Sequence, residues 1–260
     1  MEPVAGISMT PVQGLPLFGP GMSVARALLD AIHRQGEGLG SEDVCVIAQK
    51  IVSKSEGRYA RVQDVEASPE ATRIAGETER EPQMIQLILD ESSEILRATP
   101  AAIIARHRCG HVLANAGIDA SNVEEGDEGA VLLWPQDPDA SARAIREEIA
   151  ELSGARPAVI IADSMGRAWR IGTTGAAIGC AGLTVLDDQR GRGKDLFGRT
   201  LQATVIAVAD SIAATAALAM GEGAEGTPAA LVRGAGRWVG PDDGPGAASV
   251  LRPVAEDMFR

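Results

Sequence analysis

Four oxygen-bearing side chains, from three separate places in the sequence, could together hold a hard divalent cation. They are Asp119, Asp163, Ser164 and Glu222. Each also has an ordinary structural explanation, because an aspartate can cap a turn or a helix and a loop glutamate is often solvated. As a set they offer carboxylate and hydroxyl oxygens, which Mg²⁺ and Mn²⁺ bound to phosphates prefer over imidazole or thiolate. The residue types therefore favour a divalent metal site.

A second group, His107, Cys109 and His111, alternates at a spacing that could suggest metal ligands. Alternate residues of a strand simply share one face, and the glycine at 110 would turn His111 away from the other two. We interpret these three residues as structural.

The basic residues are unevenly distributed between arginine and lysine. Among 24 basic residues, the lysines are Lys50, Lys54 and Lys194, so each is a candidate for a specific role as well as for a solvated surface position. A loop with Arg190, Arg192, Lys194 and Arg199 could bind an anionic substrate, or could be a structural loop paired with Asp187, Asp188 and Asp195. The same two interpretations apply to Arg167 and Arg170.

Apolar periodicity predicts the elements that carry these residues. Helices are expected over residues 25–36, 69–80, 82–96, 139–152 and about 200–220, strands over 43–53 and 157–163, and a β-hairpin over 101–119 that turns at Cys109-Gly110. Ser23 can cap the first helix. Asp163 would stand where its strand ends, and ligand sites in sheets flanked by helices gather at such carboxyl ends.

Composition limits the class of protein. The 260 residues are 45% hydrophobic and carry a net charge of -12, which supports a sizeable core and argues against a general nucleic-acid or anionic-membrane binder. Small-molecule partners are expected instead. Three widely spaced cysteines predict free thiols, and the lack of a leader-like or membrane-spanning stretch predicts a cytoplasmic protein. The chain reads as one continuous unit.

The common nucleotide-binding motifs GxxxxGK[ST] and GxGxxG after a strand are absent from the sequence, so nucleotide binding would need another scaffold. Residues 13–21, QGLPLFGPG, form a rigid apolar turn that could pack against a base or be structural. Residues 220–227, MGEGAEGT, offer glycine amides that can approach phosphates closely.

Seven strings, in this order, resemble the coenzyme F420-0:gamma-glutamyl ligase family over nearly the whole chain: GLPLF, SKSEGR, NAGIDASNVEEG, DSMGRAWR, GRGKDLFGR, MGEGAEGTPA and LVRG. NAGIDASN is the most specific of them. The resemblance implies a mixed α/β (α+β) fold with two interlocked subdomains, a homodimer, and a single ligase domain over residues 1–260 without an additional C-terminal flavin reductase domain.

The resemblance also implies an activity. Family members use GTP with two divalent cations, Mg²⁺ or Mn²⁺, often with K⁺, and join L-glutamate to the terminal carboxylate of the phospholactyl deazaflavin coenzyme F420-0. Further rounds extend a gamma-linked glutamate tail. Alternatives from the same sequence are a paralogous ligase that uses another amino acid or acid acceptor, and a nucleotide-binding regulatory protein, which the retained metal ligands disfavour.

Site residues follow from the same resemblance, position by position. Asp119 and Asp163 match ligands of one metal, and Ser164 and Glu222 match ligands of the other; Ser164 stands where a threonine is common. The implied nucleotide contacts are Leu15, Pro16, Leu17, Phe18, Gln49, Lys50, Lys54, Asn122, Met220, Gly221, Glu222, Gly223, Ala224, Glu225, Gly226 and Thr227. Asp163 and Lys54 are the expected catalytic residues, with Lys54 neutralising charge on the transferred phosphoryl group while an acyl phosphate forms.

Overall fold

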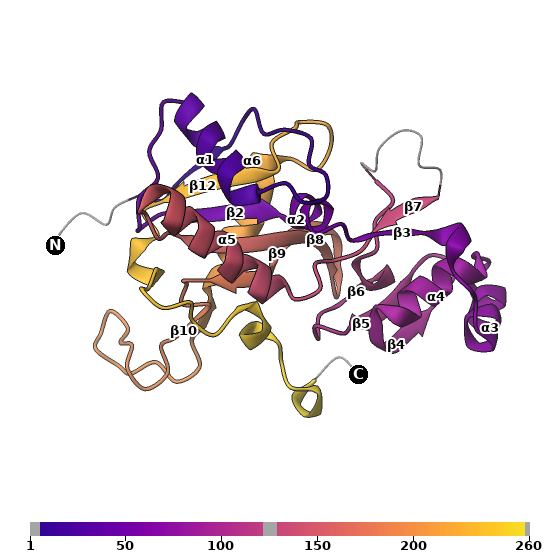
Figure 1. Cartoon of the computed structure of the whole chain (residues 1–260). Coiled ribbons are helices and arrows are strands. Elements are labelled where there is room, and N and C mark those ends of the chain that lie inside the picture. Colours follow the sequence, from indigo (N-terminus) through magenta and orange to yellow (C-terminus); the bar gives the residue numbers. More distant parts are fainter. Residues whose placement is uncertain (1–5, 122–128, 258–260) are drawn as a thin grey trace.

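A computed structural model describes residues 6–121 and 129–257 as a mixed α+β fold, as predicted (Figure 1). Its helices are α1 (Val24–Arg34), α2 (Gln49–Ser55), α3 (Pro69–Thr78), α4 (Pro82–Asp90), α5 (Pro138–Ser153) and α6 (Val208–Met220). Its strands are β1 (Ser8–Pro11), β2 (Val44–Ala48), β3 (Tyr59–Arg61), β4 (Ser92–Ala98), β5 (Ile103–His107), β6 (Val112–Ala114), β7 (Ala130–Leu132), β8 (Ala158–Arg167), β9 (Arg170–Ala181), β10 (Leu186–Asp188), β11 (Val205–Ala207) and β12 (Ala229–Arg233).

The main layer is a five-stranded sheet in the order β1-β12-β2-β8-β9. β2 and β8 are parallel, with Val44 opposite Ala158 and Ala48 opposite Ala162, and the other neighbours are antiparallel. Both central strands are apolar along their whole paired length, which is typical of strands covered on both faces. The parallel pair therefore brings the carboxyl ends of β2 and β8 to one edge.

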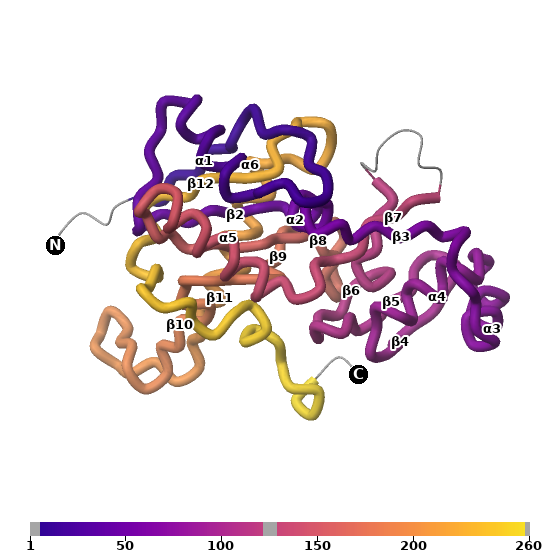
Figure 2. The backbone as a smooth tube through the Cα atoms, in the orientation of Figure 1, coloured from indigo at the N-terminus to yellow at the C-terminus, as the bar shows by residue number. Residues whose placement is uncertain are grey.

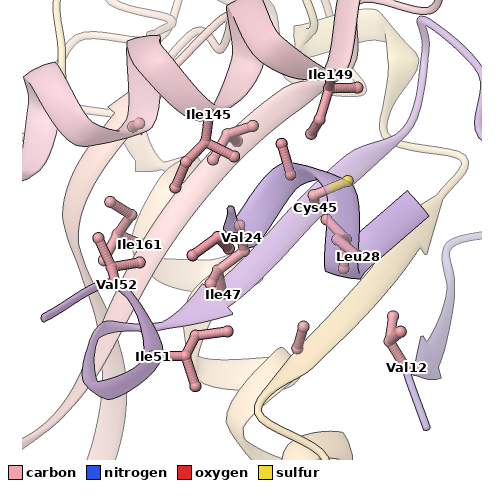
Figure 3. Packing of buried hydrophobic residues seen from close by; sticks show 14 of the residues in the cluster. Val12, Val24, Leu28, Cys45, Ile47, Ile51, Val52, Ile145, Ile149 and Ile161 are labelled. Carbon is pink, nitrogen blue, oxygen red and sulfur yellow. The ribbon is translucent and has the colours of Figure 1, made fainter. Parts of the chain in front are cut away.

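Helices cover both faces of this sheet (Figure 2). On one face, Leu28 of α1 and Ile149 of α5 pack with Ile47 and Ile161 of the central strands (Figure 3). On the other face, α6 packs against the intervening strand residues, such as Val46. Alternate strand residues thus enter different cores, as the two-residue period of a strand requires.

A smaller part of the chain, formed by residues 59–121 and 129–132, stands beside the sheet (Figure 1). It contains the three-stranded sheet β4-β5-β6, the two-stranded sheet β3-β7, and helices α3 and α4. Its core is separate from those of the main sheet and includes Ile74 of α3, Ile88 of α4 and Ile103 of β5. Both α3 and α4 begin with proline, which fits the first turn of a helix because its missing N–H would have no helical partner there.

Several element predictions are confirmed. The helices expected at 25–36, 69–80 and 139–152 are α1, α3 and α5, and the hairpin turning at Cys109-Gly110 is formed by β5 and β6. Cys45, Cys109 and Cys180 are all free thiols. No helix within the described residues is both long enough and apolar enough to cross a membrane.

The strand predicted over 43–53 is wrong in its second half. β2 ends at Ala48 and α2 begins at Gln49, so Lys50 and Lys54 lie on a helix one turn apart. Ile51 and Val52 are buried in the same core as the strand. A short apolar run of this kind does not distinguish a buried helical turn from a buried strand.

Two predicted helices are too long. The helix expected over 82–96 ends at Asp90, because residues from Ser92 onward pair with β5. The helix expected from about 200 begins only at Val208, and β11 before it pairs with β10. In both cases a long-range strand pairing overrides the local helix propensity.

The cap predicted for α1 is formed by Ser23, whose Oγ accepts a hydrogen bond from the Arg26 amide at 3.0 Å. The same hydroxyl donates to Glu148 Oε1 at 2.6 Å and so connects α1 to α5. We expect Ser23→Ala to lower the free energy of unfolding by about 1 kcal/mol in urea denaturation. Ser211→Ala is the control, because Ser211 lies inside α6 and its hydroxyl donates to the carbonyl of Ala207, the residue that precedes the same helix. An equal effect of the two changes would contradict the capping role.

Candidate functional site

Asp163 lies where the parallel pairing of β2 and β8 stops. The sequence predicted that its strand ends there, and this is wrong, because β8 continues to Arg167 in an antiparallel hairpin with β9. The paired positions Ala48 and Ala162 nevertheless bring Gln49 and Asp163 to the same edge. The placement at the carboxyl ends of two parallel strands is therefore as expected, although β8 itself runs on.

Both oxygens of Asp163 accept hydrogen bonds. Ser164 donates its backbone N–H to Oδ1 at 2.8 Å, and Trp134 donates its indole Nε1–H to Oδ2 at 2.8 Å. Burial raises the pKa of this carboxyl to about 6, the two donors act in the opposite direction, and the negative charge of Asp119 adds to the rise. A nearby cation would stabilise the ionised form of this carboxyl, because its positive charge would offset both the cost of burial and the repulsion from Asp119.

Asp119 forms an ion pair with Lys50, with Nζ 2.7 Å from Oδ2. Its other oxygen accepts the Ser121 amide at 2.6 Å, and Lys50 also donates to Ser121 Oγ at 2.7 Å. Burial raises the pKa of Asp119, but the Lys50 and Ser121 hydrogen bonds outweigh it, so the pKa lies below its ordinary value. Asp119 is therefore the ionised carboxylate of the pair, and Asp163 is the one whose charge responds near neutral pH.

Ser164 and Glu222 are also brought together. The Ser164 hydroxyl donates to Glu222 Oε1 at 2.5 Å, although the two residues come from β8 and from the turn after α6. The four predicted metal ligands thus form two adjacent sets joined through the neighbours Asp163 and Ser164. Within residues 6–121 and 129–257, no three His, Cys, Asp or Glu side chains already form a metal-binding cluster. The metal centre remains a prediction.

The donor types fit a hard divalent cation. The set offers carboxylate oxygens and one hydroxyl, without imidazole or thiolate, and Asp163 is a partly buried carboxyl with a raised pKa. His107 and His111, by contrast, lie against the Trp134 ring, with centroids 4.8 and 5.6 Å away.

The segments that carry the predicted nucleotide contacts lie at the two ends of α2. Ala48, which precedes α2, donates its N–H to Pro228 O at 2.8 Å, directly after the turn formed by residues 220–227. The segment containing residues 15–18 leads to Gly21, whose N–H bonds to Ser55 O at the other end of α2. Within that segment Pro16 and Leu17 are exposed, Leu15 is partly buried and Phe18 is buried in the core. Asn122 lies outside the described residues.

Individual side chains of the predicted nucleotide site differ in accessibility. Gln49 is buried, and its Oε1 accepts the Ser53 hydroxyl, so its side chain is directed into the protein. Lys50 and Lys54 are partly buried on α2. In the turn, Gly223 donates its N–H to Glu225 Oε2 and Thr227 Oγ1 donates to Met220 O. Gly221, Glu222, Gly223, Ala224, Glu225 and Gly226 are exposed.

The basic loop at 187–199 is largely neutralised by its own acidic residues. Arg190 pairs with Asp188 at 2.7 Å, Arg192 with Asp187, and Arg199 with Asp195 at 2.6 Å. Of the two interpretations, the internally paired structural loop therefore describes these arginines. Arg167 and Arg170 are exposed at the tip of the β8–β9 hairpin.

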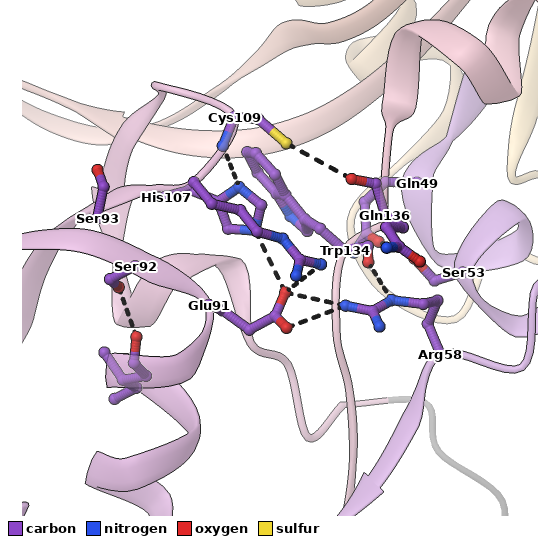
Figure 4. Close-up of polar contacts among 12 residues, drawn as sticks. Gln49, Ser53, Arg58, Glu91, Ser92, Ser93, His107, Cys109, Trp134 and Gln136 are labelled. Carbon is purple, nitrogen blue, oxygen red and sulfur yellow. Dashed lines mark hydrogen bonds and ion pairs between the residues drawn. The ribbon is translucent and has the colours of Figure 1, made fainter.

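Two side chains that sequence reasoning did not select stand beside the site. Trp134 donates a hydrogen bond to Asp163. Glu91 pairs with Arg58 and lies near His107, and both of these residues contact Trp134 (Figure 4). Neither Trp134 nor Glu91 belongs to a motif that the sequence analysis recognised, and the rarity of tryptophan, with three in the chain, is the one signal that could have pointed to position 134. A cavity of about 410 Å³ is lined by Gly182, Leu183, Thr184, Val185, Leu186, Gly240, Pro241, Asp242, Gly244, Pro245 and Ser249, and none of the predicted site residues lines it. The candidate site is therefore the region around Asp119, Asp163, Ser164 and Glu222 rather than this cavity.

Comparison with known proteins agrees with the resemblance. The family model for F420-0:gamma-glutamyl ligase matches residues 14–234. A coenzyme F420:L-glutamate ligase of Methanothermobacter thermautotrophicus is 44% identical over 255 residues, covering 98% of this chain and 99% of its own. Proteins with the same name from Archaeoglobus fulgidus and Methanopyrus kandleri are 44% and 38% identical; the alignments cover 88% and 99% of this chain and 88% and 100% of theirs.

Proposed function

Because the chain belongs to the F420-0:gamma-glutamyl ligase family, we propose that it joins L-glutamate to coenzyme F420-0 in a reaction driven by GTP. The observation that carries the site assignment is the group formed by Asp163, Asp119 and Lys50 at the carboxyl ends of β2 and β8. The proposal includes two divalent cations, a K⁺ ion and a homodimer, all of which rest on the family resemblance.

The proposed reaction balances as two displacements. The terminal carboxylate of F420-0 attacks the γ-phosphorus of GTP and releases GDP, giving an acyl phosphate. The α-amine of L-glutamate then attacks the acyl carbon, loses a proton and expels inorganic phosphate as the amide bond forms. Repetition on the new γ-carboxylate would extend the tail.

The residues of the chain would act mainly by positioning and by charge. Asp119, Asp163, Ser164 and Glu222 would hold the divalent cations, which when bound would neutralise phosphate charge. Lys50 would keep Asp119 ionised and oriented, since it already forms an ion pair with that carboxylate. Lys54, one helical turn further along α2, would stabilise the charge on the transferred phosphoryl group.

The direct test uses purified protein with GTP, L-glutamate, Mg²⁺ or Mn²⁺ and F420-0, followed by mass spectrometry of the deazaflavin and an assay of GDP. We expect mass gains in glutamate-sized steps matched by GDP release. A protein that binds GTP and metal but adds no glutamate would overturn the substrate assignment and favour the paralogous ligase. Other amino acids and acid acceptors would then be screened.

The proposed site also predicts a pH dependence of cation affinity. The pKa of Asp163 is raised to about 6, so in the metal-free protein this carboxyl is protonated below that pH and ionised above it. Because a cation needs the ionised form, we expect the affinity for Mn²⁺ to fall up to about tenfold per pH unit below 6 and to level off above about 7. Titration of Mn²⁺ between pH 5 and pH 8 measures this directly, and a flat profile would contradict Asp163 as a ligand.

A further inference from the structure

Trp134 has an unusual position for a fully buried tryptophan, because its polar atom faces the proposed active site. The side chain is 0% exposed, and its Nε1–H donates to Asp163 Oδ2 at 2.8 Å. A buried indole N–H needs an acceptor, and here the acceptor is the carboxylate with the raised pKa. The bond joins residue 134, just after β7, to the central strand β8.

The indole ring is held on several sides. His107 lies against it at a centroid distance of 4.8 Å, and His111 meets it edge-on at 5.6 Å. Gly117 leaves the space that the ring occupies: a Cβ built at this residue would lie 2.4 Å from Trp134 Nε1. Gly117 also has a φ of +73°, a conformation that favours glycine.

The backbone of Trp134 and the ring of His107 are fixed in turn by charged neighbours (Figure 4). Arg58 Nε donates to Trp134 O at 2.8 Å, and the same guanidinium binds both oxygens of Glu91 at 3.0 and 2.9 Å. The Cys109 N–H donates to His107 Nδ1, so a neutral His107 ring carries its proton on Nε2, which lies 3.5 Å from Glu91 Oε2. The orientation of the indole is therefore set by contacts independent of Asp163.

We propose that Trp134 is a positioning residue, which fixes the Asp163 carboxylate in the orientation required to bind a divalent cation. This inference rests on the proposed function, because it requires Asp163 to be a ligand. Groups that hydrogen-bond to a metal ligand orient it, and their loss typically weakens metal binding about 10- to 100-fold. Without the indole N–H, Oδ2 would lose its donor and the carboxylate would be freer to rotate away from the cation.

The test compares two tryptophans that each donate to an aspartate. Trp134→Phe removes the N–H at the site, whereas Trp238→Phe removes an indole N–H that lies 3.4 Å from Asp187 Oδ2, on the internally paired loop. The free Mn²⁺ signal in electron paramagnetic resonance gives the Mn²⁺ affinity in the presence of a non-hydrolysable GTP analogue. We expect Kd to rise roughly tenfold in Trp134→Phe and less than about twofold in Trp238→Phe.

A second measurement separates positioning from general damage. In Trp134→Phe, raising the Mn²⁺ concentration is expected to restore kcat, because the ligand is weakened rather than removed; a loss of kcat that Mn²⁺ cannot restore would overturn the inference. If Trp134→Phe does not fold, benzothienylalanine at position 134 keeps the bicyclic ring and lacks only the N–H, and the same tenfold change is expected.

The outcomes distinguish this inference from the function on which it rests. If the wild-type protein binds Mn²⁺ and adds glutamate, and the position-134 variant has the same Mn²⁺ affinity, the proposed role of Trp134 is wrong but the proposed function stands. A wild-type protein that binds no Mn²⁺ and adds no glutamate would overturn the proposed function together with this inference.

Discussion

Asp163→Asn is expected to lower the rate of glutamate addition by about 10³-fold or more while the protein stays folded. The change removes the negative charge from the proposed ligand, and the amide nitrogen of asparagine would face one of the two donors, Trp134 Nε1–H or Ser164 N–H. Loss of several kcal/mol of charge stabilisation corresponds to this size of effect, since about 1.4 kcal/mol is tenfold in rate. Product formation by mass spectrometry and Mn²⁺ affinity are the two measurements.

The matched control is Asp210→Asn. Asp210 is also a partly buried aspartate whose pKa is raised by burial, and it accepts a single backbone N–H from Ala177 at 3.0 Å. It lies on α6, which packs on the opposite face of the sheet from α1 and α5. We expect this variant to keep its activity within about threefold, because it removes a comparable charge outside the site. Asp163→Asn with activity within tenfold of the wild type would exclude Asp163 from the chemistry.

Glu91→Ala is expected to lower the free energy of unfolding by about 1–3 kcal/mol, because it removes the buried carboxylate that accepts hydrogen bonds from the partly buried Arg58 guanidinium. Glu91 is 6% exposed and lies 2.9 Å from Arg58 Nη2 and 3.0 Å from Arg108 Nη2. Glu91 follows α4 and Arg108 follows β5, so these contacts connect both elements to Arg58, which bonds to the Trp134 carbonyl. Urea denaturation at pH 7 measures the loss.

Glu77→Ala is the control for Glu91. Glu77 pairs with Arg73 at 2.7 Å on the exposed surface of α3, and such pairs contribute about 0–1 kcal/mol. Equal destabilisation by the two variants would contradict the importance of the buried network.

The contribution of Glu91 to the free energy of unfolding should decrease as the pH falls. Burial raises its pKa, but His107, Arg58 and Arg108 outweigh burial, so the folded-state pKa lies below the ordinary 4.5. A carboxyl with a lowered folded-state pKa contributes stability that is present above 4.5 and is lost as the pH falls through the folded-state value. The difference in stability between the wild type and Glu91→Ala should therefore shrink in acid, and a difference that stays constant down to pH 3 would contradict this account.

Much of the local structure follows from neighbouring residues. Ser23 caps α1 as its side chain predicts, and α5 and the β5–β6 hairpin form where the apolar pattern places them. Predictions failed at Gln49, Ser92 and Val205, where an element starts or changes type because of contacts with distant strands or a shared core. Local periodicity carries no information about such partners.

The site divides in a similar way. Residue types alone selected Asp119, Asp163, Ser164 and Glu222, because a hard cation requires oxygen ligands, and the order of the motif strings indicated the family. Only the tertiary structure brought Lys50 to Asp119, Glu222 to Ser164 and the Trp134 indole to Asp163. These contacts join segments distant in the chain, and the parallel register of β2 and β8 places Gln49, at the start of α2, beside Asp163. The side-chain types of the site residues thus determined which ligand they could bind. The orientation of these side chains and the pKa of Asp163 were decided by burial and by neighbours that no local pattern specifies.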